Sequence, residues 1–279
     1  MKIAGGIICG IVLIPILIIA LILGGVFGAL GFFGGIFDEG ADKNSAANTA
    51  VGDMKSYEIY SDIYKLDIEI GAADFKIEQG ESFSVESNLK NLRVTEEQGC
   101  LYLEEATRRG KISTGVSYED AVLTIFIPEK AEFREIELSC GAGRLTIDRL
   151  VSESLEFELG AGEVSIGELT ATKGADIKGG AGSITISGGM LCNLDLEMGM
   201  GQVNLTSALK GECELQSGLG EANIRLLGSR DDYSVRIEKG IGSIFVDGEN
   251  ITDGKIFGNG ENRVAVEGGI GAINLEFSN

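Results

Sequence analysis

Five carboxylate residues recur at regular intervals in the sequence, at the same position of a repeated sequence motif. Each stands four residues before a glycine; the five are Glu137, Glu156, Asp176, Asp195 and Glu214. Carboxylate oxygens are the ligands that calcium and magnesium take in proteins, so a ladder of them predicts weak divalent-cation binding or attraction of basic partners. The alternative is a solvated face that keeps a chain of net charge −20 in solution. Both interpretations remain open from the sequence.

The amino-acid composition limits which catalytic and metal-binding mechanisms are possible, because the chain contains no histidine and no tryptophan. A Ser-His or Cys-His nucleophile pair, a histidine base and histidine-ligated zinc are therefore excluded. Two carboxylates can suffice for glycoside hydrolysis, so a carbohydrate-active β-helix enzyme stays as an alternative. The main insertion among the repeats, residues 247–262, brings Asp253 and Lys255 but one aromatic residue, Phe257. We expect no catalytic residue, no cofactor and no nucleic-acid partner.

The five cysteines show no pairing pattern. Cys9 lies in an apolar N-terminal run, and Cys192 and Cys213 fall in neighbouring repeats but two positions out of phase. A disulfide between these two is therefore disfavoured. We expect Cys100, Cys140, Cys192 and Cys213 to be free thiols, with Cys213 facing inward as a small apolar residue.

The carboxylates must be positioned by a repeated sequence motif. The motif reads LSCGAGRLTI at Leu138 and recurs six more times. Its first glycines stand at 141, 160, 180, 199, 218, 240 and 269, at intervals of 19, 20, 19, 19, 22 and 29. A degenerate copy at Ile68 has Ala73 in place of the second glycine. A unit this short cannot bury an apolar face alone, but stacked units can. We predict an all-β, single-stranded parallel β-solenoid, right-handed, with coils of about 19–20 residues stacked in sequence order.

Strict alternation of apolar and polar residues on both sides of each glycine pair predicts two strands per coil and a sharp corner between them. The structural corner glycines are Gly141, Gly143, Gly160, Gly162, Gly180, Gly182, Gly199, Gly201, Gly218, Gly220, Gly240, Gly242, Gly269 and Gly271. The residue between the two glycines is always apolar, so we expect it to point inward. Beyond the corner, one outward column is nearly neutral: Thr146, Ser165, Thr185, Asn204, Asn223, Phe245 and Asn274.

The N-terminal part differs in composition from the repeats. Residues 3–37 carry no charge, which is long enough for one transmembrane α-helix that contacts the membrane through residues 7–33. A cleaved signal peptide is the alternative. Lys2 precedes this run and acidic residues follow it, which favours a cytoplasmic N-terminus and extracytoplasmic repeats. We therefore predict four segments: 1–37 as the anchor, 38–61 as a flexible linker, 62–135 as an N-terminal β section or cap, and 136–279 as regular repeats.

The sequence also resembles a known family. The opening LDIEIGAADFKI, the strand GCLYLEE, the passage AVLTIFIPEKAEFREIELSCGAGRLTI and the repeated GxG coils are similar to the bacterial putative-adhesin family of β-strand repeat proteins, a domain of unknown function. The resemblance extends from about Asp62 to Asn279. It implies a β-helical fold, frequent attachment to a membrane anchor, and a place near cell-envelope stress systems for some members. It transfers no active-site residue.

These observations together predict a single-pass cell-membrane protein whose extracytoplasmic solenoid is an adhesin-like or cell-envelope scaffold module. The expected partner is a cell-surface polymer or an envelope protein. A regulatory protein of the envelope-stress response, in contact with another membrane protein, is the alternative that the sequence leaves open.

Overall fold

The computed structural model describes residues 51–105, 118–252, 254 and 256–278. The chain divides into two compact units, Met1–Ala46 and Ala47–Asn279, and all described residues belong to the second. The expected membrane anchor at 1–37 lies outside the described residues. Within the described part, no helix is long and apolar enough to cross a membrane.

The described residues of the second unit form β-strands and two single-turn 3-10 helices. The elements are β1 (Val51–Glu58), β2 (Lys65–Gly80), β3 (Ser84–Leu89), β4 (Leu92–Glu97), β5 (Cys100–Glu105), η1 (Tyr118–Asp120), β6 (Val122–Pro128), β7 (Phe133–Ile186), β8 (Gly189–Cys192), β9 (Leu194–Lys210), β10 (Glu212–Leu227), η2 (Arg230–Asp232), β11 (Tyr233–Val246), β12 (Glu249–Asn250), β13 (Ile256–Phe257) and β14 (Asn262–Ser278). Strand β1 lies within the range expected as linker and pairs antiparallel with β3.

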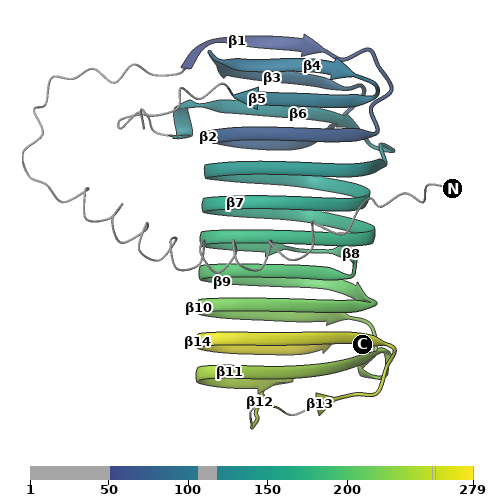
Figure 1. Ribbon diagram of the computed structural model, residues 1–279, viewed down its shortest axis with the longest axis vertical. Helices are drawn as coiled ribbons and strands as arrows, with labels where there is room; N and C mark the ends of the chain where they lie inside the picture. The colour runs from purple at the N-terminus through teal and green to yellow at the C-terminus, as the bar shows by residue number, and fades with distance from the viewer. Residues whose placement is uncertain (1–50, 106–117, 253, 255, 279) are drawn as a thin grey trace, which may run out of the picture. The chain divides into compact units, whose positions relative to one another are not determined.

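Successive coils stack along one axis, and their strands pair in parallel (Figure 1). Strand β7 winds through several coils without a break, because its pairing with neighbouring strands continues through each corner. The registers align equivalent positions of the repeats, as when Leu215 pairs with Leu196 before the corner and Ile224 pairs with Leu205 after it. The predicted parallel solenoid is confirmed.

The order of coils at the C-terminal end differs from the predicted sequence order. Strand β14, the last in the chain, lies between β10 and β11 and pairs in parallel with both. Gln216 of β10 therefore pairs with Glu267 of β14, which in turn pairs with Glu238 of β11. Stacking in sequence order was the wrong prediction here. The long connection between β11 and β14 supplies the chain needed for this return.

The N-terminal end repeats the same arrangement. Strand β2 pairs with the first coil of β7 on one edge, and with β5 and then β6 on the other. Although β5 and β6 follow β2 in the sequence, they form the coil outside it. The first and last long strands thus have partners on both edges, and neither is an open edge strand.

The core is a continuous column of apolar side chains running along the stack. All its buried residues lie between Ile59 and Leu275, within the second compact unit. The coils formed by β7, β8 and β9 also have a third short side that the two-strand prediction missed. There the inward residues are Leu150, Leu169, Ala171, Leu191 and Leu209, all fully buried, with β8 pairing between β7 and β9.

The corner glycines are required by the close approach of backbones in adjacent coils. A Cβ atom at Gly160 would lie 2.0 Å from the carbonyl oxygen of Gly141. At Gly162 it would lie 1.9 Å from the carbonyl oxygen of Gly143, and φ there is +146°, a conformation that L side chains rarely adopt. The equivalent glycines of the other repeats meet the same kind of contact.

The apolar residue between the two glycines does not point inward, contrary to the prediction. Ala142 and Ala181 are half-buried and Ala161 is exposed, while Leu219 and Ile241 are also exposed. The dihedral angles of the glycine pair interrupt the simple in-and-out alternation of a strand, so extrapolating alternation through the corner placed these side chains on the wrong side.

The glycine contacts predict a sharp contrast between two substitutions. Gly162→Ala should lower the free energy of unfolding by roughly 1–3 kcal/mol or more, because it combines a backbone clash with an unfavourable positive φ. Gly174→Ala is the control, since a Cβ there meets nothing within 4 Å; it should be neutral or stabilising by up to about 1 kcal/mol. Urea unfolding of both variants measures the difference, and equal stabilities would contradict the close packing of the corners.

The order of coils predicts which cysteine pairs can be oxidised to a disulfide. In a background with the part-buried Cys192 replaced by serine, Gln216→Cys and Glu267→Cys should cross-link, because in-register neighbours lie about 4.8 Å apart. Gln216→Cys with Glu238→Cys should not, because these positions are two coils, about 9.6 Å, apart. Non-reducing electrophoresis after mild oxidation reads out both pairs. If only the second pair cross-linked, β10 and β11 would be direct neighbours and the coils would stack in sequence order.

Candidate binding faces of the stack

The predicted carboxylate ladder forms a continuous column on the strands that precede the corners. Its members, here called the acidic column, are Asp67, Glu137, Glu156, Asp176, Asp195 and Glu214. Asp67 pairs with Glu137, and Asp195 pairs with both Asp176 and Glu214. The stacked glycines 141, 160 and 180 set Glu156 between Glu137 and Asp176. Asp67, at the equivalent position of the degenerate copy, continues the five predicted carboxylates onto β2.

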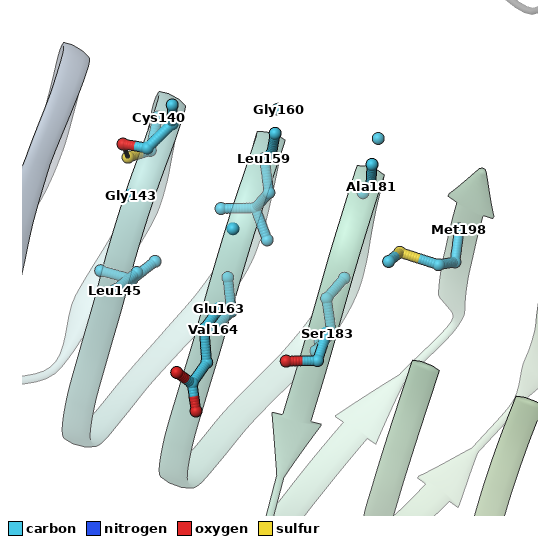
Figure 2. Close-up of a pocket in the computed structure, with 16 residues that line it drawn as sticks. Cys140, Gly143, Leu145, Leu159, Gly160, Glu163, Val164, Ala181, Ser183 and Met198 are labelled. Atoms are coloured by element: carbon cyan, nitrogen blue, oxygen red, sulfur yellow. Dashed lines mark hydrogen bonds between the residues drawn. The ribbon is translucent and has the colours of Figure 1, made fainter. Parts of the chain in front are cut away.

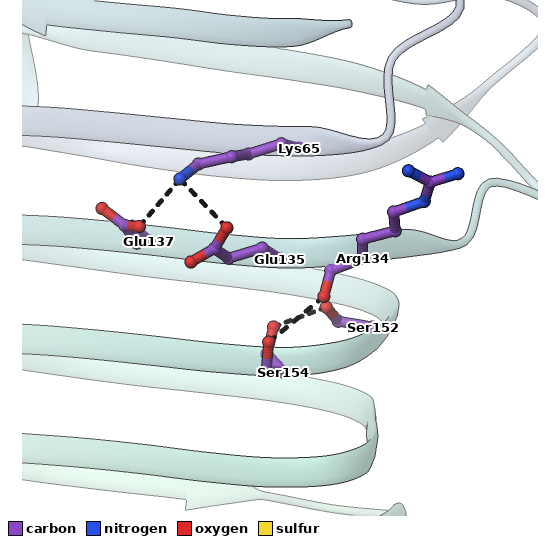
Figure 3. A network of polar contacts seen from close by, with 6 residues as sticks. All are labelled: Lys65, Arg134, Glu135, Glu137, Ser152 and Ser154. Atoms are coloured by element: carbon purple, nitrogen blue, oxygen red, sulfur yellow. Dashed lines mark hydrogen bonds and ion pairs between the residues drawn. The ribbon is translucent and has the colours of Figure 1, made fainter. Parts of the chain in front are cut away.

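Near its N-terminal end, the acidic column is partly neutralised by Lys65 on β2. The Lys65 ammonium lies 2.9 Å from a carboxylate oxygen of Glu137 and 3.1 Å from one of Glu135 (Figure 3). The hydrogen bond from Lys65 lowers the pKa of Glu137, and the two carboxylates raise the pKa of Lys65. The side chains are roughly a quarter to a half exposed, so solvent screens this pair.

A second lysine reaches the column near its middle. Lys178 Nζ lies 3.0 Å from Asp176 Oδ2. Burial alone would lower the pKa of Lys178, but the hydrogen bond to Asp176 and the nearby carboxylates of Glu156 and Glu197 raise it. Asp176 Oδ1, by contrast, is buried without a hydrogen-bond partner in the described structure. The column is therefore not a uniform row of unbalanced charges.

The carboxylates beyond Lys178 show the effect of crowding. Burial, followed by the charges of Asp176 and Glu214, raises the pKa of Asp195. Burial and the charge of Asp195 also raise the pKa of Glu197. Like charges that face each other across neighbouring strands disfavour ionisation. A cationic partner would therefore relieve the most charge repulsion at this part of the face, around Asp195 and Glu197.

An open recess lies where the column meets the N-terminal hairpin of β4 and β5. Its volume is about 300 Å³, and it is lined by Asp67, Glu69, Arg93, Thr95, Glu97, Tyr102, Leu103 and Glu104. Tyr102 pairs with Asp67 and is 37% exposed. Here the face offers an aromatic ring beside several carboxylates, which suits a cationic group.

The outer face beyond the corners carries a ladder of amides and hydroxyls. Asn204 donates to Thr185 Oγ1 at 3.2 Å, Asn223 donates to Asn204 Oδ1 at 3.0 Å, and Asn274 donates to Asn223 Oδ1 at 2.7 Å. Sequence order placed Phe245 between Asn223 and Asn274. Because β14 lies beside β10, the asparagines are instead contiguous, and Phe245 ends the column on β11.

The predictions about the other chemically active residues have mixed outcomes. Cys100, Cys140, Cys192 and Cys213 are free thiols, as predicted, with Cys213 buried.

Two residues of the insertion at 247–262, Asp253 and Lys255, lie outside the described residues. Its strands β12 and β13 pair with the outer edge of β11. The guanidinium of Arg230 lies 5.3 Å from the ring centre of Phe257, so the insertion is a cap over that edge.

The cavity inside the corners is too small for a ligand. It measures about 20 Å³, room for about one water molecule. Figure 2 shows the Met198 side chain extending toward the coil that carries Ala181. Its sulfur lies 2.6 Å from where a Cβ of Gly179 would stand, so Met198 fills the space that Gly179 leaves. Among the described residues, no group of three His, Cys, Asp or Glu side chains could hold a metal ion.

Sequence reasoning missed the two lysines and Tyr102 as parts of the acidic face. Lys178 was visible in the repeat alignment, two residues before its glycine, where its side chain shares an outward face with the column. Lys65 and Tyr102 required the register of β2 against β5 and β7, which the irregular N-terminal section conceals.

Parallel coils, glycine corners and two chemically distinct faces define a β-solenoid of repeats, and a family model matches almost all of this unit. The model described as Toastrack DUF4097 covers residues 48–274, and the chain belongs to this family. No curated protein matches.

Solved structures with a similar chain path include bacterial proteins described as adhesins. One is a putative cell adhesion protein from Clostridium sporogenes, 16% identical, with a TM-score of 0.37, covering 81% of this chain and 99% of that one. Two are putative adhesins. The one from Bacteroides fragilis is 12% identical with a TM-score of 0.41, covering 80% and 96%. The one from Parabacteroides distasonis is 14% identical with a TM-score of 0.40, covering 82% and 98%.

The pKa shifts predict opposite pH effects for two substitutions. The pKa of Asp195 is raised on folding, so its destabilising effect appears as pH rises through the raised value. Asp195→Asn should therefore raise the melting temperature at pH 7 and lose this advantage at pH 3. The pKa of Glu137 is lowered, so its contribution is present at pH 7 and lost as pH falls.

Glu137→Gln is the matched control and should lower the melting temperature at pH 7. Exposed pairs contribute about 0.2–1 kcal/mol, so the shift should be no more than roughly 4 °C. Calorimetry at pH 7 and pH 3 measures both variants. Shifts of the same sign at pH 7 would contradict the assignment of the two environments.

Proposed function

We propose that this protein is a membrane-anchored, extracytoplasmic binding module of the bacterial cell envelope, adhesin-like or scaffolding rather than catalytic. The observation that supports the proposal is the acidic column, which runs across consecutive coils of one rigid stack. A surface that repeats its charge every 4.8 Å or so suits an extended, repetitive partner better than a small substrate.

The partner that fits this face is a basic segment of an envelope protein or a cationic surface polymer. The carboxylates of Asp195 and Glu197 have raised pKa values because of burial and their acidic neighbours, so a cation placed against them relieves repulsion. The recess beside Tyr102 adds an aromatic contact for a cationic group at one end. The amide ladder on the other face is already hydrogen-bonded within itself, so it offers fewer free groups to a partner.

The anchored location is supported by the sequence. Residues 3–37 carry no charge and exceed the roughly 20 residues that a spanning helix needs. The cation Lys2 precedes them, while Asp38, Glu39 and Asp42 follow. This asymmetry favours a cytoplasmic N-terminus and extracytoplasmic repeats.

Neutralising the acidic face should weaken binding of a basic polymer. Glu158, two residues after Glu156, is also exposed on this face. In the fragment 47–279, which contains every core residue that the structure describes, Glu156→Gln, Glu158→Gln and Glu214→Gln together should weaken binding of poly-lysine at least about threefold at low salt, since three exposed pairs are lost. The control changes the same number of charges on the other face, by Glu163→Gln, Glu221→Gln and Glu276→Gln. Titration calorimetry at two salt concentrations compares the variants.

Equal weakening in both triple variants would show that poly-lysine responds only to total charge, which would refute the proposed binding face. Tight binding that does not change with salt would contradict the electrostatic mechanism itself.

A further inference from the structure

One edge of the stack carries a ridge of exposed aliphatic side chains that the proposed function does not use. The residues between the corner glycines align in register: Met200 pairs with Leu219, Leu219 with Ile270, and Ile270 with Ile241. The exposed fractions are 44% for Leu219, 52% for Ile270 and 70% for Ile241. We call these three residues, together with the part-buried Met200, the apolar ridge.

The packing of the corner does not require large side chains at these positions. The equivalent residues in the earlier coils are Ala142, Ala161 and Ala181, and those corners have the same geometry. The large residues are confined to the four consecutive coils at the C-terminal end of the stack. Contiguous exposed apolar surface of this kind marks an interaction site.

The surroundings of the ridge make it protrude. Each ridge residue has glycine on both sides, so no neighbouring side chain along its own strand covers it or limits its approach to a partner. The nearest cation in the sequence, Lys239, donates a hydrogen bond of 2.5 Å to the carbonyl oxygen of Gly242, beside Ile241. Lysine stems commonly lie along apolar surface while the ammonium stays in the polar layer of a membrane interface.

We propose that the apolar ridge inserts into the interface of an electrically neutral phospholipid bilayer. A convex row of a few aliphatic side chains fits a fluid surface that deforms around it, and burial of apolar side chains at the level of the headgroups drives such binding. A second copy of the chain fits less well, because a stable protein interface takes about 20–30 residues a side. Two copies with a net charge of −20 each also repel each other.

The charge of the protein selects the type of lipid. The acidic column reaches two of the ridge corners, through Asp195 on β9 and Glu214 on β10. Glu267 and Glu238 precede the other two corners, on β14 and β11, so anionic headgroups would be repelled as the ridge approaches. We therefore expect binding to phosphatidylcholine vesicles and weaker binding when anionic lipid is added. This inference does not depend on the partner proposed for the acidic face.

The test uses the fragment 47–279, because it retains the whole core and lacks the apolar run 3–37, which would bind vesicles by itself. Flotation with phosphatidylcholine vesicles should recover the unmodified fragment with the lipid. Leu219→Ser, Ile270→Ser and Ile241→Ser together should lower the partition coefficient at least tenfold without lowering the melting temperature. The matched control replaces the alanines of the same column, by Ala142→Ser, Ala161→Ser and Ala181→Ser, and should bind like the unmodified fragment.

A fluorescent reporter gives a second readout, because the chain has no tryptophan. Ile270→Trp keeps an apolar side chain on the ridge, so its emission should shift to the blue on addition of vesicles and be quenched by brominated lipid. Ala161→Trp, three coils away from Leu219 in the stack, should show neither change.

Several outcomes would overturn the proposal. It fails if the unmodified fragment stays out of the lipid fraction, if the serine triple variant floats equally well, or if binding requires anionic lipid. It also fails if the fragment associates with itself in lipid-free buffer in a way that the serine variant abolishes, because the ridge would then be an interface between copies.

Discussion

The structure depends on how closely the backbones of neighbouring coils approach at the corners. A Cβ atom at Gly162 would lie 1.9 Å from the backbone of the coil beside it, so glycine is the residue that allows the coils to stack at the strand spacing. Because each corner rests on the one before it, the positions of a repeat are held in register along the stack. The inward columns, the acidic column, the amide ladder and the apolar ridge all follow from that register.

The termini of the second unit are arranged to protect its long strands. Strands β2 and β14 each have parallel partners on both edges. The edge of β11 is covered instead by β12, β13 and Phe257, which packs against Arg230. Exposed strand edges are templates for aggregation, and a solenoid has two of them. Here the remaining edges belong to short or covered segments rather than to the ends of the repeat array.

The sequence predicted the periodic features and missed those that need three-dimensional order. The inward columns and the neutral column containing Asn204 and Asn223 follow from alternation, and the contacts bear them out. The position of β14 could not be predicted, because equivalent repeats pair equally well in any order. The outward direction of Ile241 was missed because alternation fails at glycine dihedrals. The pairing of Lys65 with Glu137 lay hidden in an irregular section.

The position of β14 also bears on how the protein is made. Ribosomes deliver the chain from its N-terminus, so β11 is available before the coil that must separate it from β10. The C-terminal end of the stack therefore cannot be completed during synthesis by adding coils one after another, because β11 takes its place beside β14 only after β14 has been synthesised. A chain that stops early leaves both β10 and β11 without their shared neighbour.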